Sequence, residues 1–272
     1  MATTRVGDLG IVWEIAGPSN GDPLLMINGL GSPRMSWALQ VPALAGRYRV
    51  VTFDNRDVGE TGAGSAPRPY GMNQFARDAI GLIEALELGP VHVIGASMGG
   101  AIAQELVLAR PDLVRSLQIV CSWPRTDPWL AEVVQQWKDM YTAMGHDAWN
   151  RNSWVWVYTH RWFDDPANVE HVVRGNEAYA YPQTAEMFGR QCAAVLAFDA
   201  LERLASIVTP TQVIAGAEDL LTPPRYSHEI ASAISGSRLT ILPEVGHGMF
   251  WEATDLFNAT LIRFLNERRP PG

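Results

Sequence analysis

The chain has 272 residues, with 21 lysines and arginines against 29 aspartates and glutamates, which gives a formal net charge of −8 at pH 7. No basic cluster offsets that charge, so nucleic acid is not an expected partner. A chain of this length buries roughly three quarters of the surface that its unfolded form exposes, so neither disulfides nor a structural metal are needed for a stable fold.

The sequence carries no sign of a membrane or export segment. Residues 1–8 lack the apolar stretch of a signal peptide, and no apolar run approaches the ~20 residues of a membrane span. We therefore expect a cytoplasmic protein with no membrane partner. Cys121 and Cys192 lie in an apolar run and in a helical pattern, so two buried free thiols are expected.

The first part of the chain is predicted to begin with strands. Residues 4–6 and 11–15 predict a hairpin around a glycine-containing turn. Residues 24–27 and 48–53 are apolar runs typical of strands buried on both faces of a sheet. Between these two runs, residues 35–44 carry a weak helical pattern.

Helices and strands then alternate. Residues 73–86 have the pattern of an amphipathic helix that ends before a Gly-Pro pair. Residues 91–96 predict a strand, residues 101–109 a helix, and residues 117–120 a further strand. Alternation at this spacing predicts a parallel sheet covered by helices on both faces.

The alternation stops after the sixth strand. Residues 122–201 hold seven of the ten tryptophans, show helical patterns and contain no convincing strand. Strand and helix patterns resume near residue 211 and continue through two more strands. We therefore predict a helical cap of residues 122–201 inserted into a core domain made of residues 1–121 and 202–272.

One short motif stands where a predicted strand meets a predicted helix. Residues 95–99 read Gly-Ala-Ser-Met-Gly, and the first two of them end the apolar run of residues 91–96. A serine on a sharp strand-to-helix turn is the arrangement of a nucleophile elbow, in which Ser97 projects clear of the sheet. The alternative is an ordinary glycine-rich turn.

An acid and a histidine follow in order, each just past a predicted strand. Asp219 lies after the strand near residue 211, with Glu218 and Asp127 as alternatives for the same role. His247 lies after the last strand, and its flanking glycines predict a mobile, solvent-accessible ring. The other histidines show no paired spacing that indicates metal ligation, so no metal is expected.

Together Ser97, Asp219 and His247 predict a catalytic triad. A serine hydroxyl is a poor nucleophile at neutral pH unless an imidazole takes its proton. A carboxylate then holds the imidazole in the required tautomer and stabilises the imidazolium. The tetrahedral intermediate needs two backbone N–H donors, for which we predict Met98 at the helix start and Leu30 in the loop after the third strand.

The chain resembles the α/β-hydrolase superfamily, in particular the lidded group that contains 3-oxoadipate enol-lactonases, carboxylesterases, cofactor-free haloperoxidases and meta-cleavage-product hydrolases. The resemblance rests on the motifs at residues 28–31, 54–59, 95–100 and 216–223, and on Gly246-His247 with Glu252. Two positions depart from the family pattern: Asn28 stands where a histidine is usual, and Asp57 where a glycine is usual.

The resemblance implies an eight-stranded, mostly parallel sheet flanked by helices, a helical cap after strand 6, and no cofactor. It implies a serine hydrolase that cleaves a small to medium apolar ester or lactone through an acyl-enzyme. Alternatives within the fold are a carbon–carbon bond hydrolase, a haloperoxidase or perhydrolase, and a non-catalytic ligand receptor. Aromatic residues are expected to line the substrate pocket, although each could instead pack the cap helices together: Trp123, Trp154, Tyr158 and Phe250.

Overall fold

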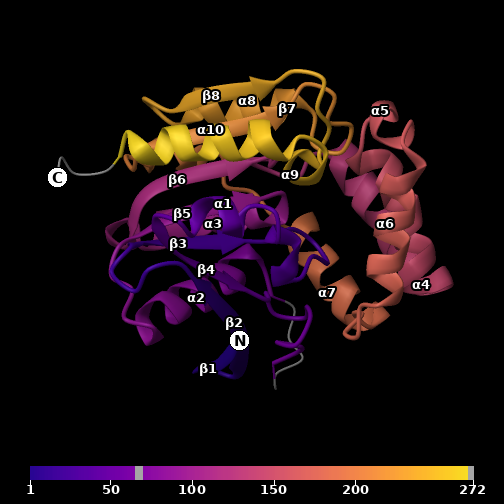
Figure 1. Ribbon diagram of the computed structural model, residues 1–272, viewed down its shortest axis with the longest axis horizontal. Coiled ribbons are helices and arrows are strands. Elements are labelled where there is room, and N and C mark those ends of the chain that lie inside the picture. The colour runs from indigo at the N-terminus through magenta and orange to yellow at the C-terminus, as the bar shows by residue number, and fades with distance from the viewer. Residues whose placement is uncertain (65–69, 269–272) are drawn as a thin grey trace.

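The computed structural model describes residues 1–64 and 70–268, and its centre is an eight-stranded sheet of order β1-β2-β4-β3-β5-β6-β7-β8 (Figure 1). The strands are β1 Ala2–Val6, β2 Leu9–Ala16, β3 Asp22–Ile27, β4 Tyr48–Phe53, β5 Val91–Ala96, β6 Val114–Val120, β7 Thr211–Gly216 and β8 Arg238–Leu242. β2 pairs antiparallel with β1 and β4, whereas the remaining pairs are parallel. The predicted mostly parallel sheet of eight strands is confirmed.

Helices cover both faces of the sheet. The helices α2 Met72–Ala85, α3 Met98–Ala109 and α8 Pro224–Ala233 pack on one face, and the helices α1 Val41–Leu44, α9 Met249–Glu252 and α10 Thr254–Asn266 on the other. Neighbouring strand residues alternate between the two apolar clusters, so that Leu24 and Met26 face one cluster while Leu25 and Ile27 face the other. The continuous apolar runs in the sequence follow from this burial on two sides.

The stretch predicted as a weak helix is divided in two. A 3₁₀ helix, η1, spans Arg34–Trp37, and α1 begins only at Val41. Pro42 lies in the first turn of α1, where its missing N–H leaves no helical hydrogen bond unmade. A second short 3₁₀ helix, η2 Pro111–Leu113, leads into β6.

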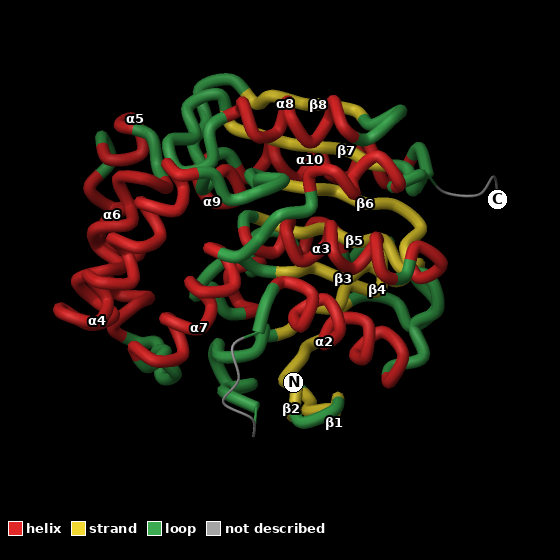
Figure 2. The backbone as a smooth tube through the Cα atoms, turned by 180° about the vertical axis from the view of Figure 1, so that it is seen from behind, coloured by secondary structure: helices red, strands yellow, loops and turns green. Residues whose placement is uncertain are grey.

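Residues 122–201, here called the inserted segment, leave the sheet after β6 and return before β7. They contain α4 Pro128–Val157, α5 His160–Phe163, α6 Pro166–Glu177, α7 Ala185–Leu196 and the first residue of the 3₁₀ helix η3 Leu201–Ser206. Figures 1 and 2 show α4, α5 and α6 to one side of the sheet. α4 is interrupted by a kink at Gly145, whose φ of 81° and ψ of −177° are not helical, so two helices meet there.

Two further expectations concern the thiols and the membrane. Cys121 and Cys192 are both free and buried, as predicted. Among the helices of the described residues, none combines the length and the apolar character needed to cross a bilayer.

Candidate active site

Ser97 occupies the sharp turn between β5 and α3. Its φ of 55° and ψ of −121° form a conformation that is rare for a residue with a side chain, and costs of order 1–3 kcal/mol. Its N–H donates to the Val120 carbonyl at 2.9 Å, and its own carbonyl accepts from the Gly100 N–H at 2.9 Å. These bonds hold the strained residue in place, and its side chain lines a cavity.

The glycines on either side of Ser97 are explained by close backbone approaches. A Cβ atom on Gly99 would lie 2.1 Å from the Ile27 carbonyl oxygen, and one on Gly95 would lie 2.2 Å from the Gly99 carbonyl oxygen. No larger residue fits at either position without displacing backbone. The glycines therefore let α3 begin directly against β3 and β5.

His247 and Asp219 form a buried polar pair. The His247 Nδ1 and Asp219 Oδ2 atoms are 2.8 Å apart. The other carboxylate oxygen, Oδ1, accepts hydrogen bonds from the Leu221 and Thr222 N–H groups at 2.9 and 2.8 Å. Asp219 follows β7 and His247 follows β8, so both lie at the same edge of the sheet as Ser97. His247 and Ser97 line the same cavity.

Thr222 is a contributor to this pair that sequence reasoning missed. Its Oγ1 lies 2.9 Å from both Asp219 Oδ2 and the Cys121 carbonyl oxygen, within reach of donating to either. The only signal in the sequence is that Thr222 lies three residues after Asp219. In turns of this kind an aspartate side chain commonly accepts hydrogen bonds from the backbone N–H groups that follow it. Thr222 thus ties the acid to the end of β6.

The two alternative acids are engaged elsewhere. Asp127 caps the N-terminus of α4, where its Oδ1 accepts from the Leu130 N–H at 2.9 Å. Glu218 forms a surface ion pair with Arg161 at 2.9 Å. Of the three candidates, Asp219 is the one that the structure brings to His247.

The electrostatics of the pair favour a charged imidazole. Burial is the largest single influence and lowers the pKa of His247. Attraction to Asp219 and Cys121, together with the hydrogen bonds to both residues, outweighs burial, so the pKa of His247 lies well above its ordinary value of 6.5. The carboxylate therefore stabilises an imidazolium in the position that would receive a proton from a nucleophile.

The expectation of a solvent-accessible histidine ring is wrong, because His247 is only 5% exposed. The end of α4 lies against the two glycines that flank it. A Cβ atom on Gly248 would lie 2.7 Å from the Tyr158 ring, and one on Gly246 would lie 2.9 Å from the Val157 carbonyl oxygen. The two glycines make room for the inserted segment rather than giving the ring freedom.

The predicted oxyanion donors lie on either side of the Ser97 turn. Met98 is the first residue of α3, and Leu30 lies in the loop after β3 beside the cavity. Within residues 1–64 and 70–268, neither the Leu30 nor the Met98 amide donates a hydrogen bond to another protein group. Both donors are thus available to a ligand.

The cavity has a volume of about 510 Å³ and runs between the sheet edge and the inserted segment. Three of the four aromatic residues predicted for the pocket lie on its wall, namely Trp154, Tyr158 and Phe250. Further aromatic and histidine side chains line it as well: Trp37, Trp137, His146, Trp149, His171, Tyr179 and Trp251. The wall is therefore mainly apolar, with several aromatic side chains in it.

Trp123 does not line this cavity, so the fourth pocket prediction is wrong. The residue lies three positions after the end of β6, and its ring is buried in the main apolar core at 3% exposure. It packs edge-to-face on Phe198 with centroids 6.3 Å apart, and its Nε1 donates to Thr126 Oγ1 at 3.1 Å. Trp123 thus packs the base of the inserted segment onto the core.

One group of potential metal ligands occurs among the described residues. Donor atoms of Cys121, Asp219 and His247 all lie within 4.8 Å of one another. The Asp219 carboxylate and His247 Nδ1 are already bonded to each other, and all three residues are buried. The arrangement is that of an imidazole–carboxylate pair with a thiol beside it.

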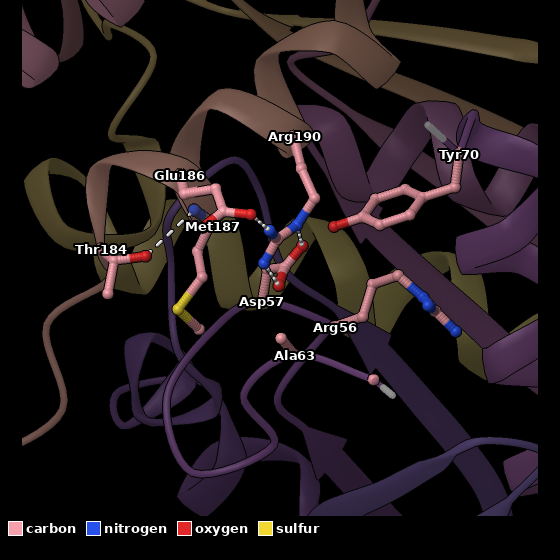
Figure 3. A pocket seen from close by; sticks show the side chains of 9 residues that line it. Arg56, Asp57, Ala63, Tyr70, Thr184, Glu186, Met187 and Arg190 are labelled. Carbon is pink, nitrogen blue, oxygen red and sulfur yellow. Dashed lines mark hydrogen bonds and ion pairs between the residues drawn. The ribbon is translucent and has the colours of Figure 1, made fainter. Parts of the chain in front are cut away.

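A second cavity, of about 310 Å³, lies where α7 meets the loop after β4 (Figure 3). Its wall includes Asp57, whose carboxylate pairs with Arg190 of α7 at 2.6 and 2.9 Å. Asp57 has a φ of 65°, in the region that glycine adopts most readily. At this position, where the family usually has glycine, the chain therefore has a carboxylate that binds Arg190 of the inserted segment.

Comparison with known proteins agrees with this geometry. The family model for the alpha/beta hydrolase fold matches residues 22–254. The chain belongs to the α/β-hydrolase family. A curated relative from Azorhizobium caulinodans, named "Putative carbamate hydrolase RutD", is 33% identical over 261 residues, covering 96% of this chain and 97% of the relative.

Solved structures give the same fold. The enol-lactonase from Burkholderia xenovorans superimposes with a TM-score of 0.88 at 25% identity, covering 97% of this α/β-hydrolase and 99% of that chain. The "Putative non-heme bromoperoxidase BpoC" from Mycobacterium tuberculosis superimposes with a TM-score of 0.85 at 27% identity, covering 96% and 97%. The family and its named hydrolase relatives support a hydrolase acting on a small molecule.

Proposed function

We propose that the protein is a serine hydrolase that cleaves a carboxylic ester or lactone of a small to medium apolar substrate. The observation that carries the proposal is the His247–Asp219 pair, 2.8 Å apart, beside a strained Ser97 that lines the same cavity. A buried carboxylate–imidazole pair next to an elbow serine is what nucleophilic acyl transfer requires.

In the proposed reaction, Ser97 Oγ attacks the substrate carbonyl carbon and its proton passes to His247. The negative charge that develops on the carbonyl oxygen is held by the Leu30 and Met98 N–H groups, which have no other protein acceptor among the described residues. His247 then gives the proton to the leaving alcohol. Water, activated by the same imidazole, attacks the acyl-enzyme and releases the acid.

The inserted segment is proposed to act as a cap domain over the site, with the core formed by residues 1–121 and 202–272. Helix α4 supplies Trp154 to the cavity wall, and Tyr158 directly follows that helix. A mainly apolar wall with several aromatic side chains favours an apolar acyl or alcohol group. A lactone fits the same chemistry because its alcohol stays attached to the acyl chain.

The proposal is tested by a screen of esters and lactones of graded acyl and alcohol size, run with the wild-type protein and with Ser97→Ala. Labelling with a fluorophosphonate provides a second readout, because it reports an activated serine without knowledge of the substrate. We expect ester turnover and labelling that both vanish in Ser97→Ala. Turnover of p-nitrophenyl esters by that variant would falsify the assignment, and failure to label the wild type would favour a non-catalytic ligand receptor.

A second candidate is carbamate hydrolysis, which the same three residues could perform. It is favoured by the curated relative named a carbamate hydrolase, which is 33% identical over nearly the whole chain. Including a p-nitrophenyl carbamate series in the screen separates the two candidates by kcat/KM. A meta-cleavage product and acetate-dependent peroxide chemistry, added to the same screen, test the carbon–carbon hydrolase and perhydrolase alternatives.

A further inference from the structure

Gln191 of α7 spans two loops of the core. Its side-chain oxygen Oε1 accepts a hydrogen bond from the Gly31 N–H at 3.0 Å. Its side-chain nitrogen Nε2 donates to the Arg56 carbonyl oxygen at 2.8 Å. The residue is fully buried, so both bonds are shielded from water. One glutamine of the inserted segment thus joins the loop after β3 to the loop after β4.

Gly31 directly follows Leu30, whose amide is one of the two proposed oxyanion donors. The loop is held on the other side by Asn55, whose Nδ2 donates to the Asn28 carbonyl oxygen at 3.0 Å. The Leu30 N–H therefore lies between two fixed peptide groups, one held by the core and one held by Gln191. Because peptide units are planar, fixing these neighbours restricts the direction of the N–H between them.

The inserted segment also approaches this loop closely. A Cβ atom on Gly31 would lie 3.3 Å from the Trp149 ring and 3.1 Å from Gln183 Oε1, and the residue has a φ of 69°. Gly31 therefore has little room to move toward the inserted segment. The inserted segment thus limits the movement of the residue that follows Leu30, while within the loop the Ser32 N–H donates to the Gly29 carbonyl oxygen at 3.3 Å.

We propose that Gln191 is a positioning residue for the oxyanion hole, through which the inserted segment holds the Leu30 amide in its catalytic direction. The inference rests on the proposed function of Ser97, Asp219 and His247 but adds a residue to it. A displacement of about 1 Å at such a donor can lower a rate by ~10²-fold, and loss of one oxyanion donor costs ~10²–10³-fold in kcat.

The test must distinguish this role of Gln191 from a simpler one, which is to anchor the inserted segment to the core. The adjacent Arg190 anchors the same helix to the same loop through its ion pair with Asp57 (Figure 3). Among the described residues, its hydrogen bonds and ion pairs go to Asp57 and Glu186 and none goes to residues 28–31. Replacing Arg190 alone would leave the buried Asp57 carboxylate unpaired. The matched control is therefore the double variant Asp57→Gly/Arg190→Met, in which glycine suits the φ of 65° at residue 57.

The test measures kcat and KM for the best ester of the screen, together with the affinity for a trifluoromethyl ketone, whose adduct with serine carries an oxyanion. We expect Gln191→Met to lower kcat by about 10–100-fold with KM changed less than threefold. The affinity for the ketone should fall by the same factor as kcat. Gln191→Glu keeps an acceptor for the Gly31 N–H and should restore part of kcat. The double variant should keep kcat within threefold of the wild type.

Three results would overturn the inference while leaving the proposed function intact, since that rests on Ser97→Ala. These are a Gln191→Met variant with kcat within threefold of the wild type, a Gln191→Glu variant no better than Gln191→Met, or a double variant that loses as much kcat as Gln191→Met. If Gln191→Met does not fold, the comparison of Gln191→Glu with the double variant decides by the same kcat and ketone measurements.

Discussion

The Ser97 turn and the inserted segment bring side chains to one cavity, but different contacts hold them there. At the turn, backbone meets backbone, and even a single added carbon on Gly99 would collide with the Ile27 carbonyl. The inserted segment is tied to the core loops by polar side chains, among them Gln191 and Arg190. We therefore expect substitutions at the turn to lower kcat by large factors. Substitutions in the inserted segment should change kcat or KM by smaller factors.

The largest effect is expected at the turn itself. Ser97→Ala removes the nucleophile without adding atoms, so we expect the free energy of unfolding to change little while kcat falls by ~10⁶-fold, as for other triad nucleophiles. Steady-state kinetics on a p-nitrophenyl ester and thermal melts check both parts. Loss of folding in Ser97→Ala would contradict the expectation that a substitution at the turn affects kcat and not the free energy of unfolding.

The next effect concerns the acid. Asp219→Asn leaves the geometry nearly intact but favours the wrong imidazole tautomer, and kcat should fall by up to ~10⁴-fold. Glu218→Gln is the matched control, because Glu218 is adjacent in sequence but pairs with Arg161 at the surface. Equal losses in the two variants would contradict the assignment of Asp219.

The pH dependence of the wild type gives a third test. The proposed base works only as neutral imidazole, and the pKa of His247 is raised well above 6.5. We therefore expect kcat/KM to rise with pH through a midpoint above 6.5, falling ~10-fold per pH unit below that midpoint. A rate profile measured from pH 5 to 9 checks this, and a flat profile across neutral pH would argue against His247 as the base.

The smallest effect is expected on the cavity wall of the inserted segment. Trp154→Leu should raise KM for esters with large acyl groups by several-fold and leave kcat for small esters near the wild-type value, because Trp154 lines the cavity. Trp123→Leu should lower the melting temperature without this selectivity, because Trp123 lies in the core cluster. KM measured across the graded esters would settle which tryptophan shapes the pocket.

Local sequence patterns were sufficient to predict the core of the fold. Strands buried on both faces leave continuous apolar runs, and glycines are required where β5 meets α3. The Ser-Asp-His order could likewise be read, because each residue follows its own strand in the chain.

The contacts that complete the site could not be predicted from the sequence in the same way. Gln191 and Gly31 are 160 residues apart, and nothing near either residue marks the bond between them. The direction of a tryptophan ring depends on packing between distant helices, so Trp123 and Trp154 could not be told apart. The contact between the end of α4 and Gly248, next to His247, likewise joins residues that are far apart in the chain.

The two glycines beside His247 also limit how the enzyme could be altered for new substrates. Any side chain at Gly248 would meet the Tyr158 ring at 2.7 Å, so a library randomised there would mostly sample damaged proteins. The opposite wall differs, since α6 has no buried residue yet contributes Val172, Gly175 and Asn176 to the cavity. Directed evolution of substrate range should therefore find its tolerated diversity along α6.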